Sequence, residues 1–248
     1  MKRKIPDWEL YERLVAQLVS EQLSTAYCVS PNAKVTGKIS NRKRQLDVLI
    51  DRRHDSERYE RVIIDAKLRR RPVDVTHVEA FQGLMTDVGA THGYLVCSSG
   101  YTKAAERRAQ SSVSVRLLPL DRMENFDPST WPRCLHSKCS HGRVFWDGYP
   151  CIDMKAAPIA GRTGKNKIIS YIHYVGKCDR CGHFHVKCLS CDDLFSPSYL
   201  SNDHGYQCKC LLPWFWLASI EEDDIGNPAA ELHFASTFDI CTVDRRSL

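Results

Sequence analysis

The sequence has no long apolar run, no internal repeat of useful length and no low-complexity tract. No segment of its 248 residues approaches the roughly 18–20 apolar residues of a membrane-spanning helix, so we expect no membrane span. The initial MKRKIPDWEL is basic without an apolar stretch behind it, so we expect no secretory signal and a cytoplasmic location. Apolar residues make up 43% and charged residues 26%, which excludes wholesale disorder.

Cysteine is scarce in the first half of the chain and abundant in the second. Residues 1–125 contain 2 of the 12 cysteines, Cys28 and Cys97, and residues 126–248 contain the other 10. Charge is uneven in the opposite sense: 22 basic against 16 acidic residues give +6 in the first half, and 13 against 14 give −1 in the second. We therefore predict a domain at 1–125, a proline-containing linker at 126–133 and a cysteine-rich domain at 134–248.

In the first half, the hydrophobic pattern predicts both helices and strands. Helices are expected near residues 6–19, 73–88 and 102–110, and strands near 26–30, 34–39, 45–51, 61–67, 93–98 and 113–120. The apolar stripe of the first helix includes Trp8 and Tyr11, Glu12 falls on its rim, and Glu9 lies further out. This order predicts an α/β fold in which helices flank a mixed sheet. The second half offers one convincing strand, at 167–175, and otherwise looks irregular.

Charged residues interrupt two of the predicted strands. In RVIIDAK, Asp65 and Lys67 are two residues apart and therefore share a face. In QLDVLID, Asp47 breaks an otherwise apolar strand. Buried charges need a partner, and carboxylates from adjacent strands make a hard oxygen site suited to Mg²⁺ or Mn²⁺, to which Glu12 would add a carboxylate from the flanking helix. The alternative is a solvent-facing ion pair at a strand end.

The text around these residues resembles a known family. RKRQLDVLID, then VIIDAK, then PVDVTHVEAFQGLMTDVGATHGYLVCSSGYTKAAERRA follow the pattern of the PD-(D/E)xK nuclease superfamily, and most closely its Mrr-type restriction endonucleases. The resemblance covers roughly residues 8–120 and includes five separated elements in the right order. It implies a restriction-endonuclease-like fold, and it does not extend to the cysteine-rich half.

By that resemblance, Asp47 and Asp65 are metal ligands, Lys67 is the catalytic lysine and Glu12 is the helix carboxylate. Gln82 matches an occasional polar position on the next helix. One departure is Asp65, where the group more often has glutamate, so the shorter side chain must sit closer to the metal.

The resemblance implies a metal-dependent endonuclease that hydrolyses nucleic-acid phosphodiester bonds, most simply Mg²⁺-dependent cleavage of DNA. It suggests the cutting component of a bacterial restriction or anti-phage defence system. Because two cuts in a duplex need two active sites, a homodimer or a partner protein is expected. The alternative is a nucleic-acid-binding or assembly module that keeps the fold without cutting; the complete set of Glu12, Asp47, Asp65 and Lys67 argues against it.

Basic residues crowd the predicted metal strands. One group precedes the strand of Asp47 and a second follows Lys67: Lys38, Arg42, Lys43 and Arg44, then Arg69, Arg70 and Arg71. Such clusters attract phosphate backbones, so we predict that they bind nucleic acid, although solvated surface is the simpler reading of any one cluster. An alternative for Arg44 is a place inside the sheet.

The second half carries paired cysteines of the kind that bind zinc. Three pairs occur close together: Cys178 and Cys181, Cys188 and Cys191, Cys208 and Cys210. Tetrahedral Zn²⁺ needs four ligands, so three pairs overfill one site and underfill two. Our first interpretation joins the 178–181 and 188–191 pairs in one structural, ribbon-like site, and its rival joins the 178–181 and 208–210 pairs.

A second metal-like cluster lies in RCLHSKCSHG. It offers four potential ligands with another cysteine beyond: Cys134, His136, Cys139, His141 and Cys151. This cluster could hold its own zinc or pair with Cys208 and Cys210, and His183, His185 or His204 could complete a second site. The sequence contains no HExxH and no HxE…CxxC arrangement, so the zinc is expected to be structural rather than catalytic.

Overall fold

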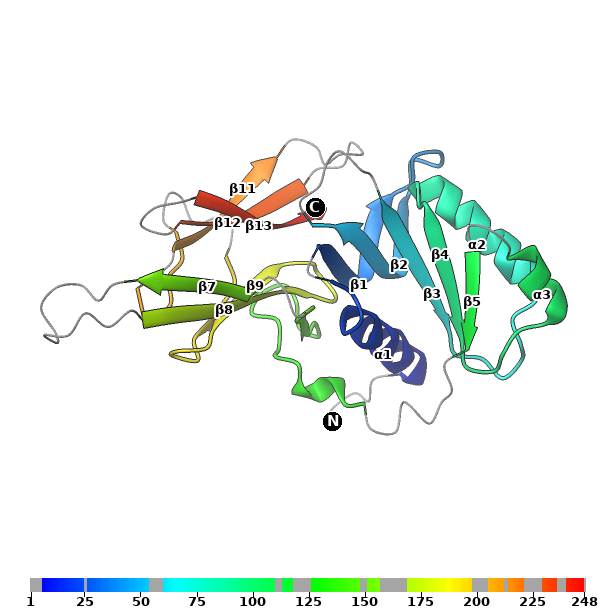
Figure 1. The fold of residues 1–248 in the computed structure, drawn as a ribbon, viewed down its shortest axis with the longest axis horizontal. Helices are drawn as coiled ribbons and strands as arrows, with labels where there is room; N and C mark the ends of the chain where they lie inside the picture. The colour runs from blue at the N-terminus through cyan, green and yellow to red at the C-terminus, as the bar shows by residue number, and fades with distance from the viewer. Residues whose placement is uncertain are drawn as a thin grey trace, which may run out of the picture. The chain divides into compact units, whose positions relative to one another are not determined.

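The chain divides into two compact units, Met1–Pro132 and Arg133–Leu248, and the division falls within the segment predicted as a linker (Figure 1). The computed structural model describes residues 6–24, 26–53, 60–109, 113–117, 126–147, 151–156, 169–197, 205–211, 214–220, 229–235 and 240–247. None of the described helices is long and apolar enough to span a membrane.

In the described residues, the first unit contains a five-stranded mixed sheet, three α-helices and a short 3-10 helix, η2 (Pro128–Thr130). Its elements follow the chain in this order: α1 (Asp7–Ser20), β1 (Tyr27–Thr36), β2 (Lys43–Arg52), β3 (Arg61–Lys67), α2 (Val75–Val88), β4 (His92–Cys97), α3 (Lys103–Arg108) and β5 (Val113–Leu117). The sheet order is β1-β2-β3-β4-β5, antiparallel from β1 to β3 and parallel from β3 to β5. The predicted α/β class with a mixed sheet is confirmed.

The core of this unit explains why these segments form these elements. Apolar residues of α2, including Val78, Phe81 and Met85, pack with Ile63 and Leu95 from the central strands. The Asp74 side chain caps α2 at its start, and Gly89 ends the helix in the left-handed conformation. Helix α1 lies against β1, β2 and β3 (Figure 1).

Two expectations for α1 are wrong. Trp8 is 49% exposed rather than part of the buried stripe. Glu9 is buried rather than outward-facing, because its carboxylate pairs with the buried guanidinium of Arg13 at 2.9 Å. Burying one charge requires its partner to be buried beside it, and helical periodicity alone does not show where such a pair will lie.

The β1–β2 hairpin extends beyond the sheet. Strand β2 pairs with β3 only from Val48 to Asp51, whereas its pairing with β1 continues to Lys43. The two strands predicted at 26–30 and 34–39 are one strand, interrupted only by Asn32, which has a φ of 52°. In the part of the hairpin that extends beyond β3, Val35 and Leu46 belong to the apolar core that contains the buried residues of α2.

In the part of the second unit that the structure describes, the regular elements are strands. Five form one sheet with β10-β9-β8-β6 in order and β7 also paired to β8: β6 (Val144–Phe145), β7 (Cys151–Ala156), β8 (Ile169–Cys178), β9 (Phe184–Cys188) and β10 (Leu194–Phe195). Three more form a second sheet in chain order: β11 (Trp214–Ile220), β12 (Ala229–Ala235) and β13 (Ile240–Ser247).

A shared apolar core joins these two sheets. Val175, Phe184 and Val186 of the first sheet cluster with Phe215 and Leu232 of the second, and each is at most 2% exposed. The expectation of a single strand in this half is therefore wrong. Strands β6 and β10, with two residues each, are too short to show a two-residue period.

Candidate active site and cysteine clusters

Asp47, Asp65 and Lys67 lie together where β2 stops pairing with β3. The Asp47 carboxylate accepts a hydrogen bond from the Ala66 backbone N–H at 2.8 Å. The Asp65 carboxyl group lies close enough to Asp47 for its negative charge to raise the Asp47 pKa. Lys67 Nζ lies 2.5 Å from Asp65 Oδ1. Two carboxyl groups and an ammonium group thus lie together on adjacent strands, on side chains that are partly accessible to solvent.

Glu12 faces this group from α1. Burial, followed by the charge of Asp47, raises the pKa of Glu12 to about 8, and Asp65 acts in the same direction while Lys67 opposes it. Burial and the charge of Asp65 raise the pKa of Asp47 to about 7. The sheet and the flanking helix therefore bring three carboxyl groups close enough to resist ionising together.

This donor set fits a divalent cation. Carboxylate oxygens are the ligands that Mg²⁺ and Mn²⁺ prefer, and a doubly charged ion would offset the repulsion that raises these pKa values. Asp47 and Asp65 lie one position beyond the paired residues Val48 and Ile64 on adjacent strands, so they are the residues that would hold the ion, with Glu12 beside them.

The raised pKa of Glu12 predicts an unusual pH dependence of stability. A glutamate with an ordinary pKa of 4.5 when unfolded and about 8 when folded binds its proton more tightly in the folded state, so its contribution to stability falls as pH rises from 4.5 to 8. Glu12→Gln mimics the protonated form. We expect it to raise the Tm of the metal-free protein by a few degrees at pH 8.5 and to change it little at pH 5, measured by circular dichroism. An equal effect at both pH values would contradict this electrostatic account.

The remaining predicted residues of the first unit are distributed less compactly. Gln82 is half-buried in the middle of α2, and within the described residues no hydrogen bond joins its side chain to the carboxyl group cluster. Arg69 contacts the His77 ring, whose Nδ1 lies 2.5 Å from Asp74 Oδ1. Arg70 and Arg71 are exposed.

The basic residues around the β1–β2 turn lie elsewhere than expected. Lys38, Arg42 and Lys43 are exposed, but the turn contacts Asp87 in the last turn of α2 rather than the metal strands. Arg44 pairs with the Asp87 carboxylate at 3.4 Å, so it stabilises the turn. From the sequence we expected both basic groups beside the carboxylates. The extended hairpin instead brings the group before Asp47 to the C-terminal end of α2.

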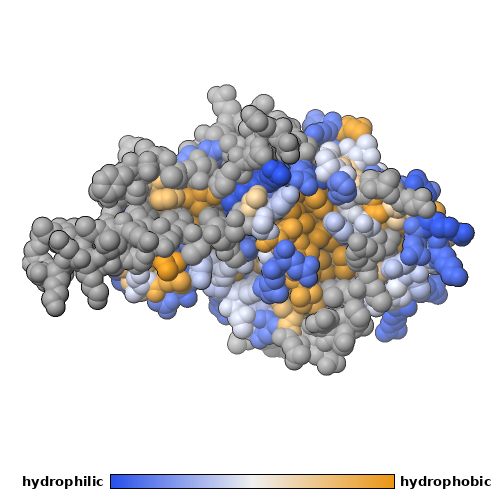
Figure 2. Space-filling view, viewed as in Figure 1, coloured by the Kyte–Doolittle hydropathy of each residue, from blue (hydrophilic) through white to orange (hydrophobic). Residues whose placement is uncertain are grey.

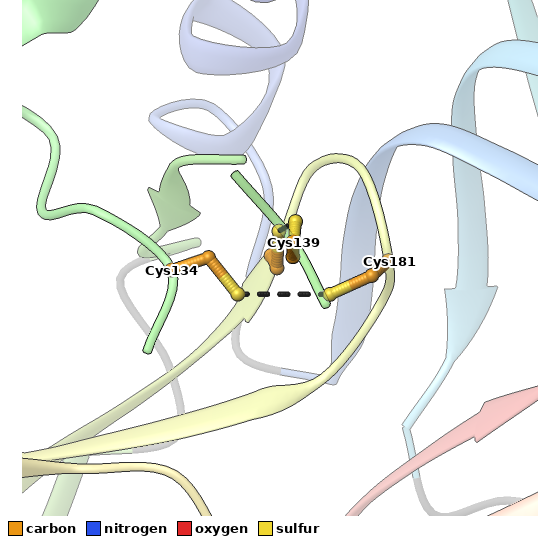
Figure 3. A group of neighbouring side chains, drawn as sticks. Cys134, Cys139 and Cys181 are labelled. Atoms are coloured by element: carbon orange, nitrogen blue, oxygen red, sulfur yellow. Dashed lines mark hydrogen bonds between the residues drawn. The ribbon is translucent and has the colours of Figure 1, made fainter. Parts of the chain in front are cut away.

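Eight cysteines of the second unit form two groups of four. The first is Cys134, Cys139, Cys178 and Cys181, and the second is Cys188, Cys191, Cys208 and Cys210. In the first group the Cys134 and Cys181 thiols point toward each other, with sulfurs 3.6 Å apart (Figure 3), and the Cys139 and Cys178 sulfurs are 3.7 Å apart. In the second group the Cys188 and Cys210 sulfurs are 3.9 Å apart.

These spacings match zinc coordination rather than disulfides. Four sulfurs at a Zn–S distance of about 2.3 Å in a tetrahedron are about 3.8 Å from one another. A disulfide would need a sulfur separation of about 2.05 Å, and the described cysteines are all free thiols.

Both expected ways of sharing the cysteine pairs are wrong. Cys178 and Cys181 lie at the turn of the β8–β9 hairpin, whereas Cys188 pairs with His173, five residues back along β8. At about 3.4 Å per residue, some 17 Å of β-hairpin separates the two pairs, so they cannot share an ion. The 178–181 pair instead meets Cys134 and Cys139, and the 188–191 pair meets Cys208 and Cys210.

Two buried histidines, His173 and His185, lie beside the cysteine groups without belonging to them. The buried His185 ring accepts a hydrogen bond from the Leu135 N–H at 2.9 Å and contacts the His183 carbonyl through Nδ1, which fixes the loop that follows Cys134. Burial lowers the pKa of His173, and its Nε2 lies 3.5 Å from the sulfur of Cys208. A neutral imidazole can donate a hydrogen bond to a thiolate there.

The other candidate ligands of the second unit are His136, His141, His183, His204 and Cys151. His136 stacks on His183, with ring centroids 3.7 Å apart, and both lie close enough to Cys181 to form an alternative three-ligand group. His141 is exposed. The side chain of Cys151 and the whole of His204 lie outside the described residues.

Fold and site together define a restriction-endonuclease-like domain of the PD-(D/E)xK type. A family model described as a restriction endonuclease, Mrr_cat, matches residues 5–126, and this part of the chain belongs to that family. No curated protein matches the sequence. Among solved structures, the crystal structure of a protein of unknown function, AF1548, is similar with 23% identity and a TM-score of 0.34. The match covers 44% of this chain and 56% of that one, little more than half its length.

Proposed function

We propose that this protein is a divalent-metal-dependent endonuclease that hydrolyses phosphodiester bonds in DNA. The observation that carries the proposal is the contact of Asp47, Asp65 and Lys67 at the β2–β3 divergence, with Glu12 facing them. The restriction-endonuclease family match supports the reaction class. The choice of DNA, the metal requirement and a role in restriction or anti-phage defence are parts of the proposal.

The residues present suggest how such a reaction would proceed. Asp47 and Asp65 would hold Mg²⁺ or Mn²⁺, which supplies positive charge to the scissile phosphate and lowers the pKa of a bound water. Lys67 Nζ, which pairs with Asp65, would orient the attacking water and donate hydrogen bonds to the phosphate oxygens on which negative charge develops. Glu12 faces the same group, and it could accept a proton once a bound cation lowers its raised pKa.

In the second unit, we propose that each four-cysteine group holds one structural Zn²⁺. All four positions in each group are thiols, which leaves no open coordination site for catalysis. The function of these ions would be to hold together short strands that pack on a core of modest size.

Incubation of supercoiled plasmid DNA with the full chain tests the nuclease proposal. We expect nicked and linear products with Mg²⁺ or Mn²⁺ and none with a chelator. A labelled single-stranded RNA in parallel reactions tests the choice of substrate: cleavage of RNA alone would contradict DNA specificity. Cleavage of neither, with DNA still bound, would support the non-cutting alternative.

A further inference from the structure

We propose that the β1–β2 turn, residues 37–43, is a second nucleic-acid contact that inserts Ile39 into a groove of duplex DNA. This inference rests on the proposed function, because it names a way in which the same protein holds its substrate. It concerns a part of the molecule that the cleavage chemistry does not use.

The turn is held rigidly by the end of α2. The Asp87 carboxylate accepts hydrogen bonds from the Ile39 N–H at 3.2 Å, the Ser40 N–H at 2.8 Å and the Ser40 hydroxyl at 2.8 Å. The Lys38 N–H donates to the Asp87 carbonyl at 2.6 Å. A Cβ atom at Gly37 would lie 2.5 Å from the Asp87 carboxylate oxygens, so only glycine permits this approach.

What the rigid turn presents is an apolar side chain bordered by cations. Ile39 is 74% exposed, the highest value among the exposed large apolar residues that the structure describes. Lys38, Arg42 and Lys43 beside it are also exposed. Figure 2 shows hydrophobic surface next to hydrophilic surface where this turn projects at the top of the view. The nearby Asp87 side chain is only 10% exposed and is occupied by Ser40 and Arg44, so its charge is turned inward.

This combination fits nucleic acid better than water or an apolar protein surface. Single exposed apolar residues are common. Ile39 also stands on a turn that four hydrogen bonds hold to Asp87. Cations on both sides of the isoleucine would contact phosphates, while an aliphatic side chain held between them can wedge between base steps in the minor groove. Holding the turn in place beforehand reduces the entropy lost on insertion.

The length of α2 sets a spacing that one duplex can span. His77, which contacts Arg69 near Lys67, and Asp87, which holds the turn, are ten residues apart on this helix. At 1.5 Å per residue they are separated by about 15 Å along the axis. Five base pairs at 3.4 Å each cover about 17 Å, so a single DNA segment can reach both ends of α2.

Fluorescence anisotropy with a fluorescein-labelled DNA duplex tests the inference, using the full chain with Asp65→Asn to prevent cleavage. We expect Ile39→Asn to weaken binding about tenfold without changing the slope of affinity against salt, because an apolar contact releases no counterions. Ile39→Leu, the matched control, should bind like the parent. Arg42→Ala should lower the salt slope by about one, as expected for one lost phosphate contact.

The possible failures are distinguishable. Equal affinity of the Ile39→Asn and Ile39→Leu variants would overturn the wedge while leaving the proposed nuclease intact. A dimer that Ile39→Asn converts to a monomer would assign the turn to a second copy of the chain and also overturn the inference. If the Asp65→Asn chain with its native Ile39 binds no duplex at all, both the inference and the proposed function fail. If binding depends on Ile39 but the chain with its native Asp65 never cuts DNA, the inference stands and only the nuclease proposal is overturned.

Discussion

Replacing Lys67 with alanine is expected to slow DNA cleavage by about 10²- to 10⁴-fold, the range associated with loss of a group that acts in the transition state. Lys67 Nζ lies 2.5 Å from Asp65 and its side chain is 35% exposed, so it can reach both a bound substrate and the carboxylates proposed to hold the metal. DNA affinity should change little, because the interaction is realised mainly in the transition state. Plasmid nicking rates and anisotropy on the same preparations separate the two effects.

Asp65→Asn is expected to show the same loss of cleavage, since the amide removes a negative charge from the pair that would hold the cation. For Lys67→Ala the matched control is Lys34→Ala, because Lys34 is an exposed lysine of β1 that lies outside the proposed site. Undiminished cutting by either site variant would contradict the assignment of these residues. A comparable loss in the control would show that general positive charge, rather than Lys67, determines the rate.

The second large effect concerns zinc. Full-length protein is expected to contain two zinc ions per chain, one for each four-cysteine group, measured by inductively coupled plasma mass spectrometry. Cys178→Ser and Cys208→Ser should each lose one ion and unfold much of the second unit, because thiolate coordination supplies folding free energy of about 10 kcal/mol or more per site. Hydrogen exchange should show this loss in the strands β8 and β9.

Cys97→Ser is the matched control for these variants. Its thiol is buried in the first unit and donates to the Gly100 carbonyl at 3.2 Å, a bond that serine can keep. It should retain both ions. One zinc per chain in the parent protein would contradict the two-site account, and no zinc would show that the groups are reduced thiols without a structural metal.

The first unit could be predicted largely from sequence because its signals are local. Strand β3 begins and ends at the predicted residues, and Asp74 caps α2 as expected. Asp47, Asp65 and Lys67 sit on strands whose apolar neighbours fix their positions. What escaped prediction depends on distant contacts, such as the Asp87 carboxylate that captures the β1–β2 turn. The TDVGA segment predicted only the end of a helix, and it did not indicate that Asp87 would bind the β1–β2 turn.

The second unit shows why cysteine spacing alone is insufficient. The CxxC pairs indicate which cysteines act together locally, but strand pairing decides which pairs meet. Antiparallel pairing of β6 with β8 puts Val144 beside Cys178, which brings the segment after Cys134 to the 178–181 turn. No periodic signal in strands as short as β6 and β10 would reveal this. The support from His173 and His185 likewise follows from the register of β8 and β9.

The rate of plasmid nicking as a function of Mn²⁺ concentration tests the central claim most directly, when the parent protein and Asp65→Asn are compared at one pH after removal of loosely bound metal. We expect the parent rate to start near zero, rise with Mn²⁺ and reach a plateau, while the Asp65→Asn rate stays near the baseline throughout. Two results would contradict a cation site formed by Asp47 and Asp65. One is a metal-free parent protein that cuts as fast as it does at the Mn²⁺ plateau, and the other is an Asp65→Asn curve that follows that of the parent.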